Sequence, residues 1–217
     1  LSVYNNDSDS VLQDVTVYKD SSVKTPSTFD KATFNFTTLV KKSFTDYAGS
    51  VKGEEKSNYT WNYKADGTTI DTTTTYLYNS GFVSATLAGA DGYLSKSTTV
   101  RGTAGTTKQI SYYTGTESGE EVISWSQEYN SLGNVKTLSV YNNDSDSVLQ
   151  DVTIYKDSSV KTPSTFDKAT FDFTTLVKKS FTDYAGTVKG EEKSDYTWNY
   201  KADGKTIDTT TTYLYNL

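Results

Sequence analysis

Polar and apolar residues alternate along most of this chain with a period of two. Tyr59, Trp61 and Tyr63 fall on one face of an extended segment, and the next segment carries a second row on one face, formed by Ile70, Thr72, Thr74, Tyr76 and Tyr78. Between the two rows, Ala65-Asp66-Gly67 supplies residues that accept the positive φ of a tight turn. Alternation bounded by such a turn is typical of paired, half-buried strands. We therefore predict a β-hairpin over residues 59–78.

Other segments repeat this pattern, and turns led by Tyr separate them. The alternating residues are Val11, Val15 and Val17, then Phe34 and Phe36, and finally Ile123, Trp125 and Tyr129. No segment shows the 3.6-residue period of an amphipathic helix. The predicted fold class is all-β: tandem antiparallel β-hairpin or meander repeats that form an extended, fibre-like array, with no helix longer than two turns.

Residues 1–80 return almost unchanged at residues 138–217, an offset of 137 positions. Six aligned pairs differ: Val17/Ile154, Asn35/Asp172, Ser50/Thr187, Asn58/Asp195, Thr68/Lys205 and Ser80/Leu217. Repetition of this kind is typical of repeat arrays. We read 1–137 as one complete repeat unit and 138–217 as the start of the next. A two-domain protein with a recent duplication is the alternative.

The middle segment, residues 81–137, favours the array because it carries strand patterns of its own. They cover 110–113, 122–129 and 135–141, and the last continues into the second copy without a spacer rich in Pro, Ser or Gly. We therefore predict that Leu138–Tyr141 is hydrogen-bonded into a sheet that also contains residues before Thr137. Because the chain lacks Met and begins within the pattern, we expect it to be a window on a longer polypeptide, with any export signal outside it.

The composition excludes several classes of function. Aromatic residues make up 14% of the chain, which argues against disorder, and Thr, Tyr and Val favour strands. A net charge of −6 without a basic stripe argues against nucleic acid as a partner. No stretch approaches the roughly 20 apolar residues of a membrane-spanning helix, and we identify no signal-peptide pattern within residues 1–217. Cys and His are absent, so the chain has no thiolate and no imidazole base.

The carboxylates are the remaining catalytic candidates. Glu54-Glu55 and Glu120-Glu121 lie beside Gly in turn-like contexts, and the first pair recurs as Glu191-Glu192. Two carboxylates can form a glycosidase pair, but an active site copied unchanged every 137 residues is improbable. We predict that the chain is not an enzyme, with no catalytic and no cofactor-binding residues.

Three binding features have simpler structural explanations. The loop Asn5–Asp9, repeated at Asn142–Asp146, resembles the start of an EF-hand but lacks its Gly and its final Glu, so we predict a solvated turn and no metal site. The row Tyr59, Trp61 and Tyr63 can stack on sugars, and it can equally serve as core. Glycosylation triplets occur at Asn6, Asn35, Asn58 and Asn143; two of them vanish in the second copy, which argues against N-linked glycans.

Two sequence segments resemble the YD repeats of RHS-type bacterial proteins. They are YNSLGNVKTLSVYNND at 129–144 and NYKADGTTIDTTTTYLYNSG at 62–81. Each has a Tyr, a nearby Gly and a strand ending in Tyr, although Asn or Lys follows the first Tyr here. The resemblance implies a β-hairpin sheet on an exported bacterial protein. The long, nearly identical repeat also resembles the tandem β-motif fibre proteins of uncultured bacteria, which implies an extracellular or cell-surface location.

We therefore expect a structural subunit of an extracellular bacterial fibre or filament. Its expected partners are neighbouring repeats of the same chain and, in fibre assembly, identical chains. The alternative is the stalk or shell segment of a YD-repeat-type surface adhesin or toxin-delivery protein.

Overall fold

A computed structural model describes residues 1–20, 22, 24 and 29–215 of the chain. Within these residues the secondary structure consists of fourteen β-strands and three 3-10 helices of three residues each. The all-β class and the absence of longer helices are thus confirmed for the described residues. The chain divides into an N-terminal unit, Leu1–Thr106 with Thr116–Gly119, and a C-terminal unit, Thr107–Gly115 with Glu120–Leu217.

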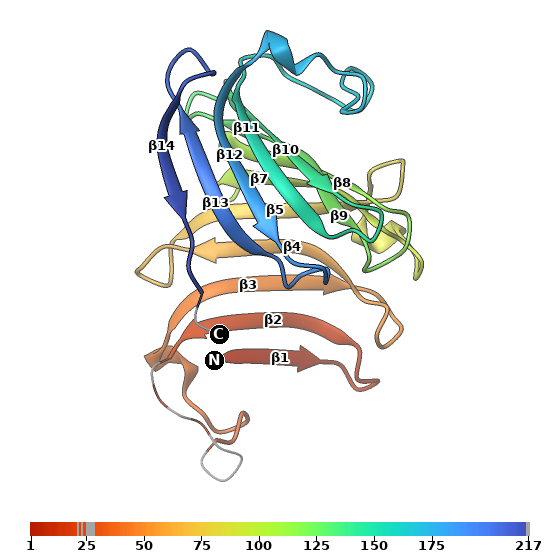
Figure 1. The fold of residues 1–217 in the computed structure, drawn as a ribbon. Helices are drawn as coiled ribbons and strands as arrows, with labels where there is room; N and C mark the ends of the chain where they lie inside the picture. Colours follow the sequence, from red (N-terminus) through yellow and green to blue (C-terminus); the bar gives the residue numbers. More distant parts are fainter. Residues whose placement is uncertain (21, 23, 25–28, 216–217) are drawn as a thin grey trace. The chain divides into compact units, whose positions relative to one another are not determined.

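The N-terminal unit is an antiparallel meander in which strands next to each other in sequence are neighbours in the sheet (Figure 1). The order is β1-β2-β3-β4-β5-β7, and β6 pairs only with β5. Two 3-10 helices lie in its loops, η1 (Phe36–Thr38) and η2 (Ala85–Leu87). The strands are β1 (Ser2–Asn6), β2 (Leu12–Lys19), β3 (Val40–Ala48), β4 (Lys56–Tyr63), β5 (Ile70–Tyr78), β6 (Val83–Ser84) and β7 (Leu94–Arg101).

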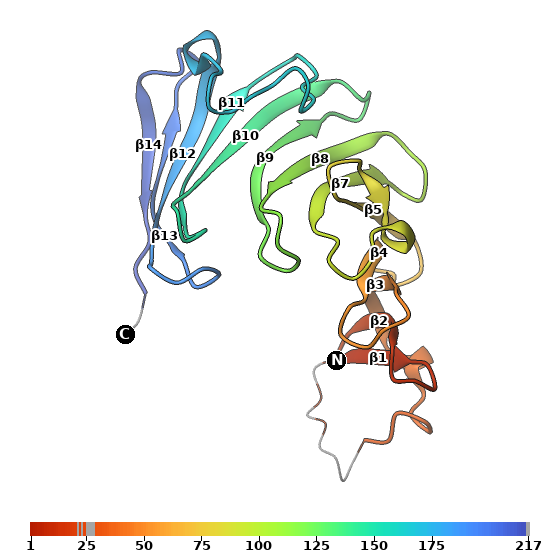
Figure 2. The same cartoon turned by 90° about the vertical axis from the view of Figure 1, so that its right-hand side faces the viewer.

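The C-terminal unit is a second meander, from β8 to β14, with η3 (Phe173–Thr175) between β11 and β12 (Figure 2). Its strands from β10 onward repeat β1 to β5 of the N-terminal unit. They are β8 (Thr107–Thr114), β9 (Val122–Tyr129), β10 (Val135–Asn143), β11 (Leu149–Lys156), β12 (Val177–Ala185), β13 (Lys193–Tyr200) and β14 (Ile207–Thr212).

The predicted hairpin over residues 59–78 is confirmed as β4 and β5. Lys64 N donates to Thr69 O at 2.8 Å, and Gly67 N donates to Lys64 O at 2.9 Å. Gly67 has a φ of +69°, and a Cβ there would lie 2.8 Å from the backbone N of Lys41. Glycine is therefore required at this position by both conformation and space.

Bulges interrupt the regular alternation. Opposite β4, strand β5 contains one extra residue, Asp71, because Asn62 pairs with Thr72 and Tyr63 pairs with Ile70. The extra residue separates Ile70 from the row that continues to Tyr78. The predicted single face over Ile70–Tyr78 is thus only partly correct, since a bulge shifts the side chains on one side of it.

The predicted strand around Phe34 and Phe36 is wrong. In the described part of residues 20–39 there is no strand, and Phe36 begins η1. Asp30 Oδ1 accepts from Ala32 N at 2.9 Å, and Asn35 Oδ1 accepts from Thr37 N at 3.1 Å. These side-chain bonds to the backbone stabilise turns in place of a ladder. We call residues 20–39 the first aromatic loop and 157–176 the second.

Strand β10 crosses the boundary between the two sequence copies without a break. Leu138 pairs with Gln127 of β9 on one side and with Tyr155 of β11 on the other. Its side chain is 0% exposed. The prediction that Leu138–Tyr141 shares a sheet with residues before Thr137 is thus confirmed, and the two copies meet inside one hydrogen-bonded strand.

Candidate functional site

The predicted turn carboxylate Glu55 binds backbone amides. Its Oε1 accepts from Leu12 N at 2.8 Å and its Oε2 from Gly53 N at 2.8 Å. The hydrogen bond from Leu12 is the main reason that the pKa of Glu55 lies below its ordinary value. Glu192 makes the equivalent bonds to Leu149 and Gly190 in the second copy. Each carboxylate therefore links its own turn, through Gly53 or Gly190, to the start of another strand, at Leu12 or Leu149.

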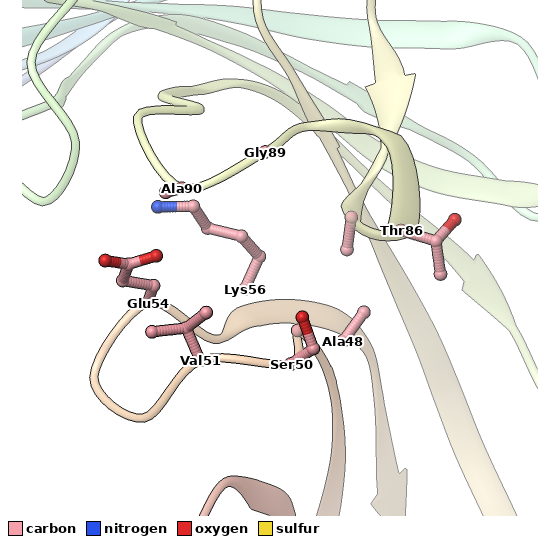
Figure 3. A pocket seen from close by; sticks show the side chains of 10 residues that line it. Ala48, Ser50, Val51, Glu54, Lys56, Thr86, Gly89 and Ala90 are labelled. Carbon is pink, nitrogen blue, oxygen red and sulfur yellow. The ribbon is translucent and has the colours of Figure 1, made fainter.

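A pocket of about 260 Å³ lies beside this turn in the N-terminal unit (Figure 3). The side chain of Lys56 extends between the turn that carries Glu54 and the loop that carries Ala90 (Figure 3). Lys56 is 9% exposed, and its Nζ donates to Ser118 Oγ at 2.6 Å. The pocket thus contains one carboxylate and one ammonium group that already has a protein partner. This set does not define a reaction.

The other predicted pair, Glu120 and Glu121, lies in the turn between β8 and β9. Glu120 Oε2 accepts from Lys189 Nζ at 2.8 Å, and both side chains are partly or largely exposed. Exposed ion pairs of this kind contribute little to stability. Glu54 and Glu55 belong to the N-terminal unit and Glu120 and Glu121 to the C-terminal unit, so neither unit contains both pairs.

The acidic loop after β1 is a closed turn. Asp7 Oδ1 accepts from Asp9 N at 2.9 Å and from Val11 N at 3.0 Å, and Asp7 Oδ2 accepts from Gln13 Nε2 at 3.3 Å. Asp144 repeats this arrangement in the second copy. Among the described residues, no three acidic, His or Cys side chains form a group that could hold a metal ion.

Two of the glycosylation triplets have structural roles, and Asp can replace Asn in only one of them. Asn35 caps η1, and Asp172 caps η3 in the same way, through a bond from Thr174 N at 3.0 Å. Asn58 Nδ2 donates to Asp46 Oδ2 at 2.9 Å. The corresponding Asp195 cannot donate, and its charge, after burial, raises the pKa of Asp183.

The predicted aromatic row is half-buried in both copies. The rings of Tyr59 and Trp61 are 4.9 Å apart, and Phe44 of β3 lies 5.4 Å from Trp61. Phe181, Tyr196 and Trp198 repeat the cluster. Tyr63 contacts Lys41 instead, with its ring 5.7 Å from Nζ. The rings stabilise the sheet across strands, and each of them stays partly exposed.

A second pocket, of about 420 Å³, lies in the C-terminal unit where the ends of four strands meet. Lys178 Nζ lies 5.3 Å above the ring of Tyr200 there. The pocket provides point charges for an anion but no fixed set of donors, so it does not define a ligand. Its lysines are Lys136, Lys156, Lys178, Lys179 and Lys201.

A buried polar network joins the middle segment, residues 81–137, to the second copy. Gln127 of β9 is 1% exposed. Its Nε2 donates to Asp157 Oδ2 at 3.0 Å and to Ser159 O at 2.8 Å, and its Oε1 accepts from Lys161 N at 2.8 Å. One strand side chain thus makes three bonds to the second aromatic loop.

An ion pair completes this network. Lys161 Nζ donates to Asp157 Oδ2 at 2.8 Å and to Ser159 Oγ at 2.7 Å. Burial acts to raise the pKa of Asp157, but the bonds from Lys161 and Ser159 outweigh it, so the pKa lies below its ordinary value. Since every partner is satisfied, the buried pair is stable, and loss of one member leaves an uncompensated charge.

Aromatic packing surrounds the same contact. Trp125, on the same face of β9 as Gln127, stacks on Tyr112 at 4.1 Å and meets Phe166 edge-on at 4.8 Å. Phe166 is 4% exposed and also contacts Phe171 at 5.1 Å. We call Trp125, Gln127, Asp157, Lys161 and Phe166 the copy junction.

Sequence reasoning missed the copy junction. Asp157, Lys161 and Phe166 are identical in the first copy, so the repeat alone does not reveal their role. The available signal was Gln127, a polar residue at the same alternating positions as Ile123, Trp125 and Tyr129. A polar side chain on a buried face needs partners.

A scan against protein-family models and a search of curated proteins gave no match. Among solved structures, the chain is similar to a porin-like protein from Bacteroides uniformis, with 10% identity, a TM-score of 0.28, and coverage of 92% of this chain and 82% of that one. In the described part of the chain, no helix has the length and apolar character needed to cross a bilayer.

Proposed function

We propose that this chain is a structural subunit of an extracellular bacterial fibre built from tandem β repeats. The observation that carries the proposal is the copy junction together with β10. Strand β10 is paired on both sides across Thr137 and Leu138, and Gln127, Trp125 and Phe166 join the two copies through buried contacts. A joint of this kind transmits load through hydrogen bonds and packed rings. A flexible linker would leave the two copies free to move against each other.

The residues examined as catalytic or metal-binding candidates support the same proposal. Glu55, Glu192, Asp7 and Asp144 bind backbone amides in turns, where they stabilise the fold. The absence of enzymatic activity remains a prediction. The half-exposed row of Tyr59 and Trp61, repeated as Tyr196 and Trp198, favours the second candidate, a sugar-contacting stalk or shell of a surface adhesin or toxin-delivery protein.

Electron microscopy of a polypeptide with four consecutive 137-residue units tests the fibre proposal. We expect continuous filaments whose length grows in proportion to the number of units, and no protease cleavage at the position equivalent to Thr137. Separate globular particles joined by cleavable links contradict the proposal. Saturable quenching of Trp fluorescence by an oligosaccharide, lost when Trp61 and Trp198 are both replaced by Ala, favours the adhesin.

A further inference from the structure

The two aromatic loops have nearly the same sequence but different neighbours. In the C-terminal unit, β9 lies beside β10 and covers the second loop through Trp125 and Gln127. In the N-terminal unit, β1 is equivalent to the second half of β10, because Leu1–Asn6 matches Leu138–Asn143. Strand β1 is the first strand of the sheet order, so among the described residues no strand occupies the position that β9 has beside β10.

One buried atom of the first loop lacks the partner that its equivalent has. The side chain of Asp20 is 6% exposed, and its Oδ2 accepts no hydrogen bond from the described residues, although it lies 3.0 Å from Lys24 Nζ. The equivalent Asp157 Oδ2 accepts from both Lys161 and Gln127. At Asp20 the lysine stays close as an ion pair, whereas the bond that Gln127 of β9 donates to Asp157 has no counterpart. Buried acceptors are rarely left without a donor.

The surroundings of Asp20 differ from those of Asp157 in the same direction. Phe29 is half-buried, whereas Phe166, beneath Trp125, is 4% exposed. The Lys24 side chain is 22% exposed, whereas that of Lys161 is 7% exposed. These three equivalent pairs describe one surface that is covered in one copy and open in the other.

We propose that the edge of β1, with Asp20 and Phe29, is a socket for a strand of the β9 type. The occupant is the segment equivalent to Val122–Tyr129 from the copy that precedes it in a tandem array, and this assignment rests on the proposed function. The register follows from β9 and β10: Leu1, Ser2 and Val3 pair with the residues equivalent to Gln127, Ser126 and Trp125.

The side chains of the occupant match the socket. The Gln places its Nε2 on Asp20 Oδ2, and the Trp covers Phe29. A further contact is available at Asn6, since the equivalent Asn143 Nδ2 donates to Ile123 O of β9 at 3.1 Å. Strand addition supplies affinity through main-chain bonds, and the Trp and Gln supply specificity.

The test uses the full chain and a labelled synthetic peptide with the sequence of residues 120–131. We expect saturable binding by fluorescence anisotropy and slower hydrogen exchange in the complex at Ser2 and Val3, the β1 residues that this register pairs with the peptide. Peptides carrying Trp125→Ala or Gln127→Glu should bind at least ten-fold more weakly. Because these changes lie in the peptide, they do not affect the folding of the chain.

A matched pair of chain variants locates the site. In Asp20→Asn, Oδ1 still accepts from Ser22 N while an NH₂ group replaces Oδ2, so it faces the donor of the incoming Gln. We expect at least ten-fold weaker binding with Asp20→Asn and unchanged binding with Asp157→Asn, whose site is already filled by β9.

Three results overturn the proposal: no binding, equal binding of the substituted peptides, or an equal effect of the two chain variants. Sedimentation of the full chain addresses the source of the strand. A monomer is expected, and a concentration-dependent dimer that Asp20→Asn abolishes overturns the assignment to a neighbouring copy in the same array. Loss of the socket leaves the fibre proposal standing, because filament imaging tests that proposal separately.

Discussion

The two aromatic loops allow one substitution to be compared at two sites in a single chain. Phe166→Ala removes a ring that is 4% exposed and contacts Trp125, Phe171 and Phe173. Truncation of a buried Phe costs about 3–5 kcal/mol through lost transfer energy and the cavity left behind. Phe29→Ala removes the same atoms from a half-buried position, so about half of the transfer free energy is lost and no closed cavity forms. We therefore expect a loss of about 1–2 kcal/mol in stability.

The predicted difference of roughly 2 kcal/mol corresponds to an approximately 30-fold difference in the opening equilibrium, since about 1.4 kcal/mol is a factor of ten. Native-state hydrogen exchange can measure it separately in each copy, from amides of β11 and β12 in one variant and of β2 and β3 in the other. The variant Trp125→Ala serves as a control, because it should weaken protection at β11 while leaving β2 unchanged. Equal losses at Phe29 and Phe166 would refute the argument that β9 covers only the second loop.

Three further predictions concern charge. Burial and the charges of Asp195 and Asp151 raise the pKa of Asp183 above its ordinary value of 3.8. The protonated Asp183 therefore contributes fully to stability below pH 3.8, and this contribution is lost as the pH rises through the pKa of the folded state. Asp195→Asn, which restores the residue of the first copy, should therefore raise the free energy of unfolding in urea at pH 7 by about 0.2–1 kcal/mol. This gain should vanish near pH 3. A variant with no gain at about pH 7, or with a gain that persists at about pH 3, contradicts the prediction. The pKa of Glu55 is lowered, so its contribution is present above its ordinary value near 4.5 and is lost as pH falls through the folded value. Glu55→Gln with Glu192→Gln should flatten the fall of the melting temperature below that pH, and an unchanged slope counts against the backbone bonds as its cause. EDTA should leave the melting temperature unchanged, and a drop of several degrees restored by Ca²⁺ would show that the loop of Asp7 binds metal.

The strands and the tight hairpin could be predicted from sequence because their signals are local. Alternation and a Gly with positive φ fix β4, β5 and the turn between them, and the strand pattern at 135–141 predicted the continuity of β10. The bulge at Asp71 could not be predicted, because an extra residue in a ladder depends on the partner strand. A short alternation was also misleading at Phe34 and Phe36, where Asp30 and Asn35 bind the backbone and stabilise turns.

The copy junction was beyond sequence reasoning for a different reason. Asp20 and Asp157 lie in nearly identical sequences, yet only Asp157 accepts a bond from Gln127. The difference arises from a strand about 30 residues upstream in the chain, and pairing at that distance is specified by register and packing. The candidate carboxylates were correctly placed in turns, but their backbone partners became visible only in three dimensions.

The position of β9 within the repeat has a genetic consequence. The complete unit, residues 1–137, carries one aromatic loop near its start and one β9 segment near its end, so a single unit encodes both halves of the joint. Unequal crossing-over between the two copies at matching codons inserts or deletes whole units. Each inserted unit brings a loop for the preceding β9 and a β9 for the following loop, so no loop between two units is left without a β9. The chain can therefore change length by recombination without any new interface having to evolve.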